Sequence, residues 1–290
     1  MMSANGTGKL VRHKYLPYVY YQAIRDLQPV WKLEDMRTME TFYWDKQHRR
    51  RTFTPSEALL YAIIHDHQAY AQYLLSHYAE KALAMPGKYF CHVPASVPHL
   101  MMAVRYNRRE ILGLVLQVAR RVPSLRACLN QGGCFNSEDN KTPLHLACEL
   151  VHLDAIILLL CNGASPQVED QNGMTPLDVI LDKLQDSEVN VGGKKQCLNN
   201  LLMFLPEVRF KMKRTLEEDR VRWTNVLGEE TLNYLVGCTP APLFLIAMQK
   251  ILQLLPSDKL LESLHQLPIP SSLKSLPVPG NQLEPLRPKD

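Results

Sequence analysis

Three adjacent side chains, His65, Asp66 and His67, are of the types that ligate metals and transfer protons, and Gln68 follows them. A metal or catalytic cluster is one interpretation of this group. The residues fall, however, in a predicted turn between two helices, where polar side chains make turn contacts or face a partner. We therefore interpret His65 to Gln68 as turn residues and as a candidate surface for a partner protein.

The other reactive residues form no recognisable catalytic or metal-binding set. The seven cysteines have irregular spacings and no CxxC pair, which indicates reduced thiols in the cytosol rather than disulfides or a zinc site. No Ser/His/Asp or Cys/His set, phosphate-binding glycine loop or acid pair occurs in a context that supports chemistry. The sequence therefore predicts a protein that is not an enzyme, with no catalytic residue, no metal and no cofactor.

The charge pattern argues against nucleic acid as a partner. The net charge of +4 is spread over short clusters, whereas nucleic-acid binding requires basic residues concentrated on one face. The densest basic run, residues 46–51, is interpreted as a solvated loop, with an import signal or an anionic-ligand patch as the alternative. No apolar run reaches the length of about 18 residues that a membrane span needs, and the N-terminus lacks a secretory signal. We expect a cytoplasmic protein.

A repeated segment predicts the elements that position these residues. Thr142-Pro143-Leu144-His145-Leu146-Ala147 is followed 33 positions later by Thr175-Pro176-Leu177. Thr142 can cap a helix, a proline fits the first helical position, and Asn162-Gly163 can end a second helix. His145 is interpreted as a structural residue that bonds neighbouring turns. The T-P-L-H-x-A segment and its period resemble the ankyrin repeat.

The ankyrin resemblance implies an all-α solenoid of helix pairs. Aligning Ala62 and Ala103 with Ala147 extends the repeats upstream, with longer connections at 79–95 and 120–137. In the last unit we expect a polar interruption over 185–196 and a second helix over 198–205. About four units then occupy residues 51–206, and the clearest are 137–169 and 170–205.

The remaining segments are assigned from composition and helical periodicity. Helices at 18–27 and 33–41 are expected to cap the solenoid. The expected divisions are a disordered N-terminus (1–14), a helical cap (15–50), a charged linker (207–222), a C-terminal helical module (223–279) and a tail (280–290).

The C-terminal module contains an apolar helix followed by a proline-rich segment. Thr239 and the following prolines begin a helix on which Leu243, Ala247 and Ile251 share one stripe. The helix is apolar on more than one face, so we expect one face to pack inside the chain and another against a second protein. A second helix over 257–266 leads into Leu267-Pro268-Ile269-Pro270, which the prolines hold extended.

These two features resemble a SOCS box. Pro242-Leu243 with Ala247 and Ile251 is similar to the BC box that binds elongin C, with alanine at the usual cysteine position. Leu267-Pro268-Ile269-Pro270 is similar to the cullin-5 box, and a second segment, 276–279, has the same pattern. Ankyrin repeats followed by a SOCS box are typical of the ankyrin-and-SOCS-box family of ubiquitin-ligase receptors.

This resemblance implies a function and a set of partners. The chain would be the substrate-recognition subunit of a cullin-RING ubiquitin ligase, with elongin B/C and cullin-5 as partners and a protein client on the repeats. The client would be ubiquitinated and degraded by the proteasome. The alternative is an ankyrin scaffold or inhibitor that acts without a ligase and sequesters its partner.

Overall fold

The computed structural model describes residues 19–38, 53–86, 98–132, 140–187, 189–256 and 260–268. Within these ranges the regular elements are all helices, which agrees with the expected all-α fold. The internal contacts divide the chain into two units, residues 1–146 with 170–172 and residues 147–169 with 173–290. The predicted N-terminal segment 1–14, the basic run 46–51 and the tail 280–290 lie outside the described residues.

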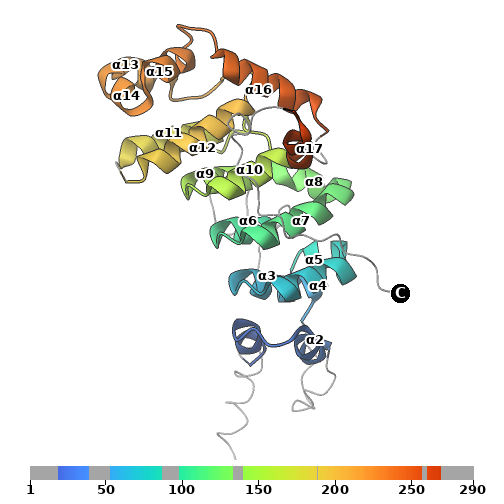
Figure 1. Ribbon diagram of the computed structural model, residues 1–290. Helices are drawn as coiled ribbons and strands as arrows, with labels where there is room; N and C mark the ends of the chain where they lie inside the picture. Colours follow the sequence, from blue (N-terminus) through green and yellow to red (C-terminus); the bar gives the residue numbers. More distant parts are fainter. Residues whose placement is uncertain are drawn as a thin grey trace, which may run out of the picture. The chain divides into compact units, whose positions relative to one another are not determined.

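The first unit consists of helix pairs (Figure 1). These are a helix over residues 19–25 with α2 (Val30–Thr38), α3 (Pro55–Ile64) with α4 (Gln68–Tyr78), and α6 (Pro98–Arg105) with α7 (Arg109–Arg121). Helix α3 contacts both α4 and α6, and α4 contacts α7, so consecutive pairs stack. The short helices α5 (Glu80–Leu83), α8 (Pro123–Ala127) and η1 (Cys128–Asn130) lie in the two connections that exceed the repeat period.

Two helix starts are closed by capping boxes that the sequence encodes. The Thr54 hydroxyl accepts a hydrogen bond from the Glu57 N–H (3.1 Å), and the Glu57 carboxylate accepts one from the Thr54 N–H (3.0 Å). Thr175 and Asp178 form the same arrangement at the start of α11 (Pro176–Asp186). Each proline occupies the first helical turn, where a missing N–H removes no helical hydrogen bond.

One turn recurs where the first helix of a pair ends. In three pairs the N–H of His67, Arg108 or His152 donates to the carbonyl of the alanine five positions earlier, at 2.8–2.9 Å. The residue before each donor has a positive φ of 52–56°. The three alanines are Ala62, Ala103 and Ala147, the positions that the sequence alignment equates.

The same turn occurs between the N-terminal helices, which were expected to cap the solenoid. Leu27 has a φ of 51°, and the Gln28 N–H donates to the Ala23 carbonyl at 3.0 Å. Helix 19–25 and α2 therefore form a repeat-like pair. This pair was not predicted as a repeat because its first helix has no T-P-L-H segment. In addition, a leucine occupies the left-handed position, where Gly, Asn or Asp is usual.

A polar network attaches α2 to α4 in the first unit. The Glu34 carboxylate accepts hydrogen bonds from the hydroxyls of Tyr70 (2.7 Å) and Tyr78 (2.9 Å) and from the Arg37 guanidinium (2.6 and 2.7 Å). The Tyr20 hydroxyl lies 2.7 Å from that of Tyr70. Because the Tyr70 proton is directed to Glu34, Tyr20 donates to Tyr70.

The second unit contains the last repeat and the C-terminal helices. Helix α9 (Pro143–Glu149) crosses the boundary between the units, and its last residues, Ala147 to Glu149, belong to the second. Helix α10 (Leu153–Cys161) follows, and α11 and α12 (Val191–Met203) come after it. The C-terminal helices are α13 (Lys213–Glu218), α14 (Arg220–Leu227), α15 (Glu229–Leu235), α16 (Leu243–Leu254) and α17 (Leu260–Gln266). Helix α12 contacts α10, α11 and α16, so it forms the centre of this unit.

Two expectations for the second unit are wrong. The polar interruption predicted over 185–196 is short, because α12 begins at Val191 and Asn190 caps it from a left-handed conformation (φ 55°). The predicted linker, 207–222, contains α13 and the first turn of α14, with Leu216 fully buried. Charged residues there cover the outer faces of short helices, and a few apolar side chains such as Leu216 supply the packing.

Candidate protein-binding surface on helix α16

Helix α16 has one face that packs within the second unit. Leu245, Met248 and Leu252 are buried on this face, and α16 contacts α12. The buried Gln249 amide donates hydrogen bonds to the carbonyls of Leu202 (2.9 Å) and Leu205 (2.7 Å). Since these carbonyls belong to the C-terminal end of α12 and the residues that follow it, Gln249 completes their hydrogen bonding and sets the position of α16.

The opposite face of α16 is apolar and exposed. Leu243 is 82% exposed and Leu254 is 84% exposed, Ala247 is exposed between them, and Ile251 is half-buried. These positions recur at helical spacing, so they form one stripe, which we call the α16 stripe (Leu243, Ala247, Ile251 and Leu254). The structure therefore directs the three residues of the predicted BC-box-like stripe to one side of the helix, away from its buried face.

The exposed face of α16 that holds the α16 stripe carries one charge, because position 250 is seven residues from Leu243 and shares its side of the helix. Lys250 is the one charged residue of α16 and lies within 3.4 Å of the Gln253 amide oxygen. Pro242, at the start of the helix, is half-buried. An exposed, nearly uncharged leucine-containing face is typical of a surface that is covered by another protein.

The predicted cullin-binding segment is described only in part. Leu267 follows α17 and is half-buried, and Pro268 is exposed. Ile269, Pro270 and the second segment, 276–279, lie outside the described residues.

The turn residues proposed as a client surface have different environments. His67 is only 6% exposed, because it caps α4 by accepting a hydrogen bond from the Tyr70 N–H (3.3 Å). Its ring is committed to packing, so its assignment to the client surface is corrected. His65 and Asp66 are half-buried and Gln68 is exposed, so these three remain available.

His65 lies at the edge of an aromatic group. The centroid of its ring is 4.5 Å from that of Tyr21, and its Nε2 has no hydrogen-bond partner among the described residues. Burial and the positive charges of Arg25 and Arg108 lower the pKa of His65, so it is neutral at physiological pH. The arrangement is that of a packed aromatic side chain, and within the described residues no carboxylate is hydrogen-bonded to its Nε2.

His145 and two of the cysteines considered in the sequence are buried and have structural roles. His145 is fully buried, and its Nδ1 lies 2.7 Å from the Thr142 hydroxyl. Burial raises the pKa of the Cys197 thiol to about 12 and that of Cys148 well above its usual value, so both remain protonated. Among the described residues no group of three or more His, Cys, Asp and Glu could hold a metal ion.

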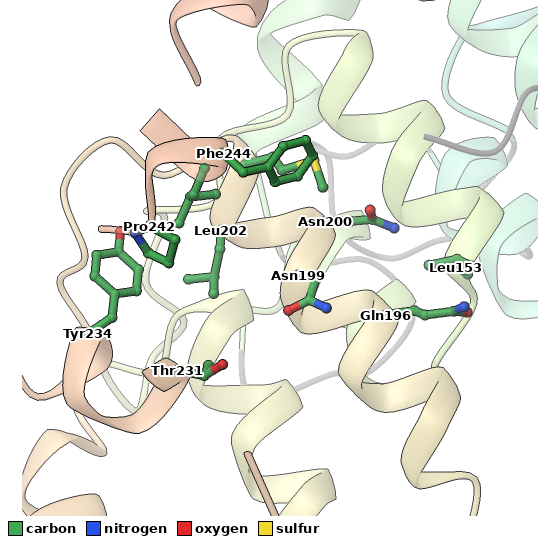
Figure 2. A pocket seen from close by; sticks show the side chains of 11 residues that line it. Leu153, Gln196, Asn199, Asn200, Leu202, Thr231, Tyr234, Pro242 and Phe244 are labelled. Atoms are coloured by element: carbon green, nitrogen blue, oxygen red, sulfur yellow. The ribbon is translucent and has the colours of Figure 1, made fainter. Parts of the chain in front are cut away.

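The structure also contains a cavity that was not predicted from the sequence. It has a volume of about 670 Å³ and lies in the second unit among α10, α12, α15 and the start of α16. Figure 2 shows three carboxamide side chains of α12, Gln196, Asn199 and Asn200, along this cavity. Their i, i+3, i+4 spacing places them on one helix face and is the signal in the sequence that could have indicated it.

Comparison with known proteins identifies the family. The family model for ankyrin repeats in three copies matches residues 100–186. The chain is 37% identical over 260 residues to ankyrin repeat domain-containing protein 9 of Mus musculus, and the match covers 80% of each chain. The chain belongs to the family of ankyrin repeat domain-containing protein 9.

Membership of this family supports a coarse statement of function. The family consists of ankyrin-repeat proteins, whose stacked helix pairs bind other proteins and which are typically not catalytic. The chain is therefore a repeat protein that takes part in protein–protein interactions. In the part of the chain that the structure describes, none of the helices combines the length and the apolar character needed to span a membrane.

Proposed function

We propose that the chain is the substrate-recognition subunit of a cullin-RING ubiquitin ligase that contains elongin B/C and cullin-5. The observation that carries the proposal is the α16 stripe. Leu243 is 82% exposed although it stands in a run of apolar residues, and the opposite face of the same helix already packs on α12. An exposed leucine on an apolar helix face is available to pack into a hydrophobic groove of a partner protein.

The α16 stripe supplies the contact with elongin C in this proposal. Leu243 enters a pocket of elongin C, and Ala247 and Ile251 pack beside it. Pro242 sets the start of the helix, with extended angles of φ −53° and ψ 141°. The alanine at the position of the usual cysteine buries less surface, so Leu243 contributes a larger share of the affinity.

Leu267, Pro268, Ile269 and Pro270 supply the contact with cullin-5. The sequence pattern supports this assignment, together with its place directly after α17. The exposed Pro268 is compatible with contact to a partner.

Catalysis in this mechanism is by proximity. The repeats bind a protein client, for which His65, Asp66 and Gln68 are candidate contacts, and the C-terminal helices hold the ligase. Transfer of ubiquitin takes place on other subunits, and the rate increases because the client is held at high effective concentration. The client is then degraded by the proteasome. The cysteines that the structure describes form no disulfide, which is compatible with action in the cytoplasm.

Co-purification tests the proposal. The tagged chain is expected to capture elongin B/C and cullin-5, and Leu243→Asp is expected to lose both. Val221→Asp is the matched control, because Val221 is 78% exposed on α14 and lies outside the α16 stripe. Alanines at Leu267 and Pro268 are expected to reduce the capture of cullin-5 but not of elongin C.

The outcome that overturns the proposal is a wild-type chain that captures neither elongin C nor cullin-5. If such a chain still binds and stabilises a client, it acts as a scaffold or inhibitor without a ligase. Equal capture by Leu243→Asp and Val221→Asp would show that the α16 stripe is not the contact.

A further inference from the structure

The cavity of the second unit has a polar wall that the proposed ligase contacts do not use. Gln196, Asn199 and Asn200 lie along it on α12, and Thr231 faces it from α15 (Figure 2). The other wall is apolar and includes Met203 of α12 and Phe244 of α16. None of the side chains that line the cavity is charged.

Asn200 is the most informative residue of this wall. It is 5% exposed, and its side chain makes no hydrogen bond to any residue that the structure describes. Its amide oxygen and nitrogen are not fully buried, so they reach the solvent of the cavity. A carboxamide that has no partner in the protein and opens into a cavity can pair with a ligand there, whereas a leucine of nearly the same shape could not.

The spacing of the carboxamides indicates which class of ligand could pair with them. Gln196 and Asn200 are four positions apart on α12, which corresponds to about 6 Å along a helix axis. Two residues of an extended peptide span about 6.6 Å. Each carboxamide both donates and accepts, as does each main-chain amide of such a peptide. The absence of charged lining residues favours an uncharged segment, and Phe244 and Met203 offer contacts for an apolar side chain.

We propose that this cavity binds a short, extended and uncharged peptide segment of another protein. Asn200 pairs with one main-chain amide of the segment, Gln196 or Asn199 pairs with a neighbouring one, and an apolar side chain packs between Met203 and Phe244. The proposal does not depend on the ligase, because a chain that captures no elongin C can still bind this peptide.

A peptide library tests the inference. The full chain is screened against N-acetylated, C-amidated pentapeptides without charged residues, and dissociation constants are measured for wild type, Asn200→Leu and Asn225→Leu. Asn225 is an exposed asparagine of α14 outside the cavity, so it controls for the same chemical change. We expect wild type and Asn225→Leu to bind the same peptides, and Asn200→Leu to bind them at least about tenfold more weakly.

A second measurement distinguishes binding from a structural role. If Asn200 serves a ligand, Asn200→Leu keeps or raises the Tm of the wild-type chain while it loses the peptides. A lower Tm with unchanged binding would overturn the inference, as would a library in which no peptide binds wild type below about 1 mM. Charged peptides that bind more tightly than uncharged ones would overturn it as well.

The same proteins separate this inference from the proposed function. Asn200→Leu is expected to capture elongin C as wild type does, and Leu243→Asp is expected to retain the peptides. If the wild-type chain does not capture elongin C, only the ligase proposal is refuted. If the wild-type chain does not bind the peptides, only the proposal of a peptide-binding cavity is refuted.

Discussion

The His67 Nε2 lies 2.9 Å from the main-chain carbonyl oxygen of Gln28. The two residues occupy the same position in consecutive turns of the first unit, so the imidazole joins one repeat turn to the preceding one. Arg108 has the equivalent role in the next turn, where its guanidinium donates to the carbonyls of Ile63 (3.1 Å) and Ile64 (2.8 Å). A side chain at one recurrent position thus holds the stack of turns together.

His67→Ala is expected to destabilise the first unit by about 2 kcal/mol, because it removes the helix cap of α4 and leaves the Gln28 carbonyl without this bond. Urea unfolding followed by circular dichroism measures the loss. Gln68→Ala is the control, since Gln68 is exposed, and should change stability by less than about 0.5 kcal/mol. Equal effects of the two substitutions would refute the role of His67.

Glu34→Gln is expected to cost about 3 kcal/mol, because it leaves the largely buried Arg37 without its charged partner. Tyr70→Phe removes one neutral donor to the same carboxylate and should cost less, about 1.5 kcal/mol. Thermal unfolding of the two variants at neutral pH tests this order. A smaller loss for Glu34→Gln than for Tyr70→Phe would show that the charge of Glu34 is not needed.

The same carboxylate predicts a response to acid. Burial alone would raise the pKa of Glu34, but hydrogen bonds from Arg37, Tyr70 and Tyr78 hold it below its ordinary value of 4.5. Its contribution to stability is therefore present above pH 4.5 and is lost as the pH falls through the lower folded-state pKa. Below pH 4.5 the Tm should fall less steeply for Glu34→Gln than for wild type, and identical slopes would contradict the network.

His99 predicts a second, less acidic transition. It is fully buried, and burial lowers its pKa from 6.5 to about 4. A histidine that is neutral when folded and charged when unfolded stabilises the fold above pH 6.5 and loses that contribution as the pH falls toward 4. Between pH 7 and pH 5 we expect a loss of about 2 kcal/mol in wild type.

His99→Gln tests this expectation, because glutamine can still donate to the Ser56 carbonyl, which His99 Nε2 contacts at 3.0 Å, but does not titrate. Its stability should be nearly independent of pH over the same range. If wild type and His99→Gln have parallel profiles, the transition belongs to another group.

Asp178→Ala is expected to cost about 3 kcal/mol, because both carboxylate oxygens of this fully buried residue are used. Oδ2 accepts from Thr175 in the capping box, and Oδ1 accepts from the Met212 N–H at 2.8 Å. Hydrogen exchange should increase both at the start of α11 and near Met212. Asp182→Ala is the control, because Asp182 is half-buried on the same helix, and it should leave both regions protected from exchange. Equal exchange in the two variants would refute the role of Asp178 in joining α11 to Met212.

Leu243→Asp and Leu254→Asp should each change the free energy of unfolding by less than about 0.5 kcal/mol, because both leucines are more than 80% exposed. Leu252→Asp should cost several times more, since Leu252 is buried on the opposite face of α16. Differential scanning calorimetry separates these cases. A large loss for Leu243→Asp would mean that the α16 stripe packs within the chain and is not free for a partner.

Local chemistry determined the parts of the fold that the sequence predicted well. The Thr-Pro starts at Thr54 and Thr175 specify helix caps within four residues of chain, and the period between Thr142 and Thr175 specifies the repeat. The amphipathic pattern around Leu243 predicted a helix with two apolar faces. Each of these signals depends only on residues that are close together along the chain, so the sequence by itself is enough to read it.

Only the tertiary structure decided which polar residues are committed to packing and which apolar residues remain in solvent. His67 and Gln68 are adjacent in sequence, yet one bonds across to Gln28 and the other is exposed. Asn199 and Asn200 likewise differ in burial although their chemistry is the same. Burial depends on elements distant in the chain, such as α15 and α16 beside α12, so no local pattern could assign the cavity or the free face of α16.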